Sequence, residues 1–176
     1  TWISSSNSVD TILVTSTRDS GESWVMSPLQ TERTEVVRIS KLITAPVTKV
    51  FAWCTDYSDF DYQIIGSEAS QTRRIISRNA RRVVFVDTYA DPAIKPRRVE
   101  VSLYPPKEWR ATFTGGRWEG TGVYQLSGTE EGTRLDITFR VEKRIEGYTA
   151  EDLRRRANKV WDRYIAELEK VRHSAR

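Results

Sequence analysis

The fold is indicated most clearly by the stretch TAEDLRRRANKVWDRYIAELEKV, residues 149–171. Its apolar residues recur at the spacing of one helix face; they are Leu153, Ala157, Val160, Trp161, Tyr164, Leu168 and Val171. Gly147 precedes the stretch, and Thr149 stands three residues before Asp152, which is the spacing of a capping box. The pattern predicts a helix about 33 Å long, at 1.5 Å per residue. Its apolar face requires a broad apolar surface to lie on.

The preceding chain predicts that surface as a set of strands. The expected strands are residues 36–43, 70–77, 82–89, 98–104, 109–114, 118–127 and 133–142. From Leu135 to Glu142 apolar and polar residues alternate, which is typical of a sheet with one buried and one solvated face. Two short helices are expected after the first strand, beginning near Pro46 and Asp56. The predicted fold class is therefore α+β, a curved antiparallel sheet of about seven strands around a long C-terminal helix.

This element order resembles the START-like, or SRPBCC, superfamily. The motifs that carry the resemblance are Ile43-Thr44-Ala45-Pro46, Val50-Phe51-Ala52-Trp53, Tyr57-Ser58-Asp59-Phe60, and Gly120-Thr121-Gly122 through Leu135-Asp136-Ile137-Thr138. It extends over residues 35–171 and implies a helix-grip fold with an elongated cavity under the long helix. In that superfamily the cavity holds a lipid, polyketide, sterol, quinone or other apolar molecule. Because the superfamily has no universal catalytic motif, the resemblance transfers no active-site residues.

Composition excludes several kinds of chemistry. The chain has one histidine, His173, and one cysteine, Cys54. No His/Cys metal site, no Ser-His-Asp or Cys-His nucleophile and no internal disulfide can therefore be assembled, and we expect no cofactor and no metal. A lone cysteine fits a reducing compartment, and no segment has the pattern of a secretory signal or a transmembrane helix. A cytoplasmic location is predicted.

The amino-terminal residues differ from the rest of the chain. Residues 1–34 are rich in Ser and Thr and contain only short apolar patches. We expect them to form a flexible extension. Residues 35–176 are expected to form one helix-grip domain without internal repeats.

Aromatic side chains are the candidates for lining the cavity. Trp161 and Tyr164 lie on the apolar face of the predicted helix with Ala157, and Phe60 is a candidate for the mouth. The candidates on the strands are Tyr89, Tyr104, Phe113, Trp118 and Tyr124. Alternation does not settle which of them point inward, because the bulge-prone Gly120 and Gly122 intervene. These aromatics also suit a filled core, so both interpretations stay open.

Charged residues offer two further candidates for function. Asp87 interrupts an apolar strand; facing inward it would be a candidate proton carrier, whereas facing outward it would join a charge pair with Arg98 and Glu100. The sequence favours the outward orientation. Basic residues recur at Arg73, Arg74, Arg78, Arg81, Arg82, Arg97, Arg98, Arg154, Arg155 and Arg156, and the net charge is +4. Acids are interspersed among them and no nucleic-acid motif is present, so we expect a solvated face and no nucleic-acid partner. Transient attraction to an anionic membrane surface is the second interpretation.

The predicted function is noncovalent binding or transport of a small hydrophobic molecule, such as a lipid, polyketide, sterol or quinone-like compound. One alternative is a cyclase- or dehydratase-like enzyme in the same cavity, with Asp87 or a tyrosine as acid or base. Another is a protein-interaction module whose core is filled. An empty cavity would argue against the filled core, and an inward-facing carboxylate with a raised pKa would favour the enzyme.

Overall fold

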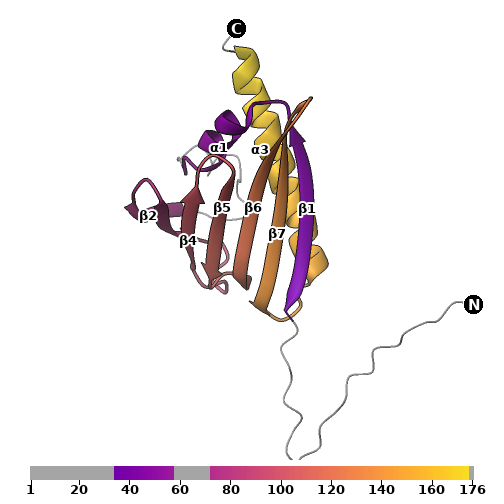
Figure 1. Cartoon of the computed structure of the whole chain (residues 1–176). Helices are drawn as coiled ribbons and strands as arrows, with labels where there is room; N and C mark the ends of the chain where they lie inside the picture. Colours follow the sequence, from indigo (N-terminus) through magenta and orange to yellow (C-terminus); the bar gives the residue numbers. More distant parts are fainter. Residues whose placement is uncertain (1–33, 58–71, 175–176) are drawn as a thin grey trace, which may run out of the picture. The chain divides into compact units, whose positions relative to one another are not determined.

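The computed structural model describes residues 34–57 and 72–174. The predicted N-terminal extension and the second short helix fall outside these residues and stay predictions. Within the described residues, one antiparallel sheet of seven strands packs against a long helix, α3 (Ala150–Ser174), and a short helix, α1 (Val47–Cys54). Figure 1 shows α3 lying along one face of the sheet.

The strands are β1 (Glu35–Ile43), β2 (Thr72–Arg78), β3 (Arg82–Thr88), β4 (Arg97–Tyr104), β5 (Glu108–Thr114), β6 (Trp118–Thr129) and β7 (Gly132–Arg144). Their order across the sheet is β1-β7-β6-β5-β4-β3-β2. From β2 to β7 the chain is a simple meander, and β1 alone is out of sequence, paired with β7. The predicted fold class, an α+β helix-grip fold with a seven-stranded sheet, is confirmed.

The sheet has one buried face because apolar residues occupy every second position. On β5, Trp109, Ala111 and Phe113 are buried, whereas Arg110 and Thr112 are exposed. A bulge does interrupt the β6–β7 register, between Glu119 and Gly120. Trp118 and Tyr124 nevertheless both face the core, so the bulge does not reverse the orientation of either side chain.

The amino terminus of α3 is fixed by the predicted capping box. The Thr149 N–H donates to Asp152 Oδ2 over 2.9 Å, and the Asp152 N–H donates to Thr149 Oγ1 over 3.1 Å. Each residue thereby satisfies a backbone donor that the first turn of the helix leaves free. This reciprocal pair starts the helix at Ala150.

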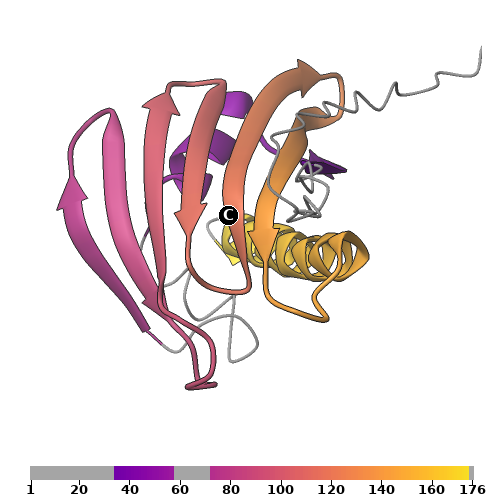
Figure 2. The ribbon, with the colours of Figure 1, turned by 90° about the horizontal axis from the view of Figure 1, so that it is seen from below.

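Along its length, α3 is held at the β1 side of the sheet. Lys41 Nζ forms an ion pair with Asp162 Oδ1 over 2.6 Å, and Thr44 Oγ1 donates to Glu169 Oε1 over 2.9 Å. Figure 2 shows the helix beneath the β7 side of the sheet, away from β2 and β3. Since one helix cannot cover the whole buried face, side chains between α3 and the far strands decide whether a cavity remains.

Candidate functional site

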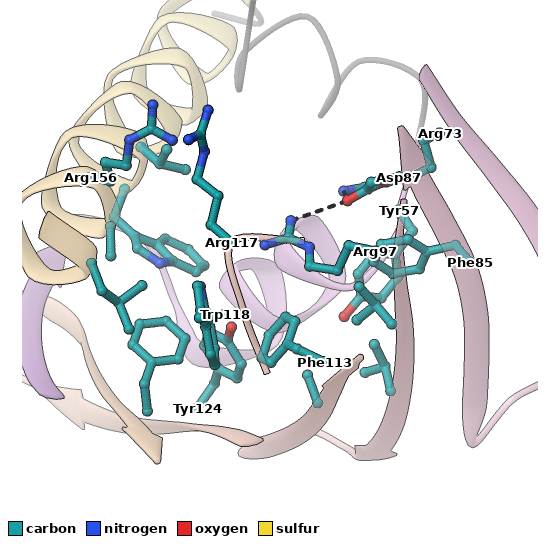
Figure 3. A pocket seen from close by; sticks show the side chains of 18 of the residues that line it. Tyr57, Arg73, Phe85, Asp87, Arg97, Phe113, Arg117, Trp118, Tyr124 and Arg156 are labelled. Carbon is teal, nitrogen blue, oxygen red and sulfur yellow. Dashed lines mark hydrogen bonds and ion pairs between the residues drawn. The ribbon is translucent and has the colours of Figure 1, made fainter. Parts of the chain in front are cut away.

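A cavity of about 220 Å³ lies between α3 and the buried face of the sheet. Its floor is built by inward-facing residues of β3 to β7, and its walls by α1, α3 and the Tyr148 segment before α3. Figure 3 shows aromatic side chains at the base of this cavity and arginines above them. The cavity therefore has an apolar end and a charged end.

The apolar end is a continuous set of ring contacts. Trp109 and Tyr124 are stacked, with ring centroids 4.9 Å apart and planes inclined by 7°. Tyr124 also meets Trp161 of α3 at 6.0 Å. The rings of Trp118 and Phe113 also contact each other, with centroids 4.7 Å apart. Offset and edge-to-face contacts of this kind form a rigid apolar surface.

Most of the aromatics predicted from the sequence come together here. The predicted residues that line the cavity are Ala157, Trp161, Tyr164, Tyr89, Phe113, Trp118 and Tyr124. Phe60 lies outside the described residues. That any of these residues contacts a ligand stays a prediction.

The assignment of Tyr104 to the cavity was wrong. Its side chain is 51% exposed, and its ring lies 5.3 Å from the Arg110 guanidinium on the solvated face. Alternation explains the difference, because Val99 and Val101 face the core and Tyr104 has the opposite parity on β4.

The outward orientation favoured for Asp87 was also wrong. Its carboxylate is only 1% exposed and lines the cavity, because it shares parity with the buried Val83 and Phe85 of β3. Arg73 donates to it twice, from Nε over 2.8 Å and from a second guanidinium nitrogen over 3.2 Å. Arg97 also donates to Asp87, from a guanidinium nitrogen to Oδ2 over 3.3 Å. The predicted outward pair forms without Asp87, between Arg98 and Glu100 over 3.0 Å.

Three arginines at the charged end were not predicted as site residues. Arg97 extends from β4, Arg117 lies in the β5–β6 turn, and Arg156 lies on α3; all three line the cavity. Burial alone would lower the pKa of Arg97, but the electrostatic interactions with Tyr89 and with the Asp87 carboxylate outweigh that effect, so the pKa is raised and the guanidinium stays charged. Two of these arginines could have been found from the sequence. Arg97 lies two residues before Val99 and so points to the same face of β4, and Arg156 follows Leu153 by three residues on the same face of the helix.

Buried phenols lie next to this charged end. Burial raises the pKa values of Tyr89, Tyr124 and Tyr148, while nearby arginine charges oppose that rise. All three phenols are therefore neutral at physiological pH and retain an O–H donor. The cavity thus offers hydroxyl and guanidinium donors above an aromatic floor.

No family model matches the chain, and no curated protein matches its sequence. Among solved structures, it is similar to the Zhui aromatase/cyclase from Streptomyces sp. R1128, with 15% identity and a TM-score of 0.60 over 78% of this chain and 94% of that one. It is similar to the di-domain ARO/CYC StfQ of the steffimycin biosynthetic pathway, with 12% identity and a TM-score of 0.62 over 80% of this chain and 52% of that one. Ara h 8.0201 is similar with 13% identity and a TM-score of 0.59, over 78% of this chain and 99% of that one.

The fold is the START-like helix-grip fold. The superfamily resemblance predicted from the sequence is confirmed at the level of the fold. None of the helices within residues 34–57 and 72–174 is both long and apolar enough to span a membrane.

Proposed function

We propose that this domain binds a small hydrophobic molecule noncovalently in the cavity between α3 and the sheet. The observation that carries this proposal is the unfilled space of about 220 Å³ bordered by the rings of Trp109, Tyr124 and Trp161. Interiors are normally close-packed, with few voids larger than a water molecule. An aromatic-lined space of this size therefore favours a binding site over a filled core.

The cavity volume favours a compact ligand. Typical small-molecule pockets enclose roughly 300–1,000 Å³, and an apolar cavity of about 150 Å³ admits benzene. A space of about 220 Å³ suits a compound with one or two rings better than a sterol or a whole lipid. Aromatic faces on the floor favour a planar ligand that can stack.

A cyclase- or dehydratase-like reaction is the second candidate, favoured by the inward-facing carboxylate of Asp87. Two of the solved structures similar in fold are aromatase/cyclases by name. Asp87, however, accepts hydrogen bonds from Arg73 and Arg97, so its oxygens are already engaged by the protein. Noncovalent binding needs no free acid or base and is therefore preferred.

Uptake of N-phenyl-1-naphthylamine, a small neutral fluorescent probe, tests the binding proposal. The parent protein should enhance its fluorescence in a saturable manner, and Trp161→Ala should change the affinity or the capacity. Tyr104→Ala is the matched control, because it removes an aromatic ring on the opposite face of the sheet. Native mass spectrometry of the protein purified without delipidation should in addition reveal a bound small molecule. No uptake and no bound species would contradict the proposal.

A further inference from the structure

We infer that the ligand of this cavity carries a carboxylate, which binds at the charged end between Arg97, Arg117 and Arg156. The inference rests on the proposed function, because it names the chemical class of the molecule that occupies the same site. The aromatic end would receive the body of the molecule. The ligand class is therefore a small aromatic acid.

The first observation is an imbalance of charge. Within the part of the chain that the structure describes, four arginines line the cavity, Arg73, Arg97, Arg117 and Arg156, against a single carboxylate, Asp87. Asp87 is occupied by Arg73 and Arg97. Among the described residues, no carboxylate forms an ion pair with Arg117 or Arg156. Cations gathered beside an apolar surface favour an anion beyond those that the described residues supply, because like charges repel more strongly where water is excluded.

The second observation is a pair of unused donors. The Nε–H groups of Arg97 and Arg117 are buried and have no hydrogen-bond partner among the described residues. A buried donor without a partner is unfavourable and in a native structure usually indicates a missing water, ion or ligand. Together with a neighbouring guanidinium nitrogen, an Nε–H forms the fork that binds a carboxylate through two parallel hydrogen bonds.

The third observation is that the arginines converge. Arg97, Arg117 and Arg156 all act electrostatically on the Tyr89 phenol, and the same three act on the Tyr148 phenol. The Tyr89 hydroxyl also lies against Gly116, beside Arg117, where an added Cβ would stand 2.7 Å from it. Figure 3 shows Arg117 and Arg156 on the same side of the cavity, above the aromatic floor. One carboxylate can therefore be reached from β4, the β5–β6 turn and α3.

The apolar end distinguishes an aromatic acid from a free inorganic anion. Phosphate or sulfate would use the arginines alone and leave the stacked Trp109 and Tyr124 facing empty space. A two-ring acid would use both ends at once. Its charge would also favour a fixed orientation, with the rings toward Trp161 and the carboxylate toward Arg117.

The test compares 2-naphthoate with 2-acetonaphthone, which has the same ring system and a neutral carbonyl group. Isothermal titration calorimetry at pH 7.5 should give at least a ten-fold higher affinity for 2-naphthoate. The variant Arg117→Gln/Arg156→Gln should abolish that preference, because it should lower the affinity for 2-naphthoate far more than the affinity for 2-acetonaphthone. Arg97 is left intact, because its removal would also break the pair with Asp87.

Arg155→Gln is the matched control. It removes the same charge from α3, one residue before Arg156, where the guanidinium is exposed and pairs with Asp152. This variant should keep the full preference for 2-naphthoate. Thermal unfolding of each variant shows whether it is folded.

The outcomes separate this inference from the proposed function. Equal affinities of the parent for the two compounds would overturn the carboxylate site and leave hydrophobic binding intact. Inorganic phosphate binding as tightly as 2-naphthoate would overturn the aromatic acid in favour of a free anion. Failure of both naphthalene compounds and of the neutral fluorescent probe to bind would overturn the proposed function itself.

Discussion

The indole of Trp161 on α3 contacts the phenol ring of Tyr124 on β6, with ring centroids 6.0 Å apart. This contact joins helix and sheet directly, although both residues also border the cavity. On the same helix face, the Trp161 ring also contacts the Tyr164 ring, with centroids 5.6 Å apart. The aromatic contact therefore links α3 to the sheet at the apolar end of the cavity.

Trp161→Ala should destabilise the domain less than the roughly 3–5 kcal/mol typical of a fully buried tryptophan. The indole is only partly buried and borders existing space, so the substitution enlarges a cavity and does not create one. Leu135→Ala, at a fully buried position outside the cavity lining, should cost about 2–5 kcal/mol. Urea unfolding measures both. If Trp161→Ala lowered the free energy of unfolding by about 5 kcal/mol and the parent protein took up no probe, the core would be filled.

Gly122→Ala should destabilise the domain by about 1–3 kcal/mol through overpacking. The added Cβ would stand 3.0 to 3.2 Å from ring atoms of Phe113, Tyr124 and Phe139, which would have to move into the cavity. Gly128→Ala is the control on the same strand, because its Cβ would meet only Val47 at 3.8 Å. If the two variants were equally stable in urea unfolding, the rings of Phe113, Tyr124 and Phe139 would be able to shift at little energetic cost.

Stability should fall as the pH rises above 10, in part because of Tyr124. Burial raises the pKa of its phenol above the ordinary value of 10.0. The unfolded chain therefore releases this proton at lower pH than the folded domain, and stability is lost above that value by up to about 1.4 kcal/mol per pH unit. Tyr124→Phe should flatten the decline between pH 10 and 11, measured by urea unfolding. Tyr104→Phe, which removes an exposed phenol on the other face of the sheet, is the control.

Deletion of residues 1–30 should leave a folded domain, because β1 begins at Glu35 and pairs fully with β7. The thermal midpoint of the truncated protein checks this. A fall of much more than about 5 °C, roughly 1 kcal/mol for a domain of this size, would mean that these residues contribute to the stability of the core.

Binding to random DNA should be no tighter than ordinary nonspecific binding, about 0.1 mM to 1 µM at physiological salt. Arg73 and Arg97 are directed into the cavity by Asp87, which leaves fewer cations for phosphate contacts. Fluorescence anisotropy with labelled duplexes measures the affinity. Submicromolar, sequence-dependent binding would contradict the small-molecule proposal, whereas salt-sensitive binding to anionic vesicles would not.

The fold was predictable because both of its periodicities are plain in the sequence. The alternation in β7 and the helical spacing in α3 each have one dominant interpretation, and the pair Thr149 and Asp152 marks the helix start. Trp161 and Tyr164 followed from the helical spacing, whereas the strand aromatics were chosen for their residue type, because alternation did not settle which of them point inward. Tyr104 was misassigned because its aromatic character was given more weight than its parity on β4.

The charged end was harder to predict, since charge usually indicates solvent exposure. Asp87 is buried because Arg73 on β2 lies directly opposite it. That pairing depends on the β2–β3 register, which contains an irregularity between Ile75 and Ser77. Arg117 lies in a turn, where neither periodicity applies. Residue patterns alone did not place these side chains in one cavity.

The pairing of β1 with β7 has a consequence for the newly synthesised chain. Thr133 Oγ1 donates to the Ala45 carbonyl, a contact that spans 88 residues, and the bond between Lys41 and Asp162 spans 121. At a synthesis rate of about 5–20 residues per second, β1 waits on the order of 4–18 s for its partner strand. During that time Val37 and Ile39, both buried in the finished domain, are exposed on an unpaired strand. The ribosome-bound chain should therefore depend on chaperone protection until β7 has emerged.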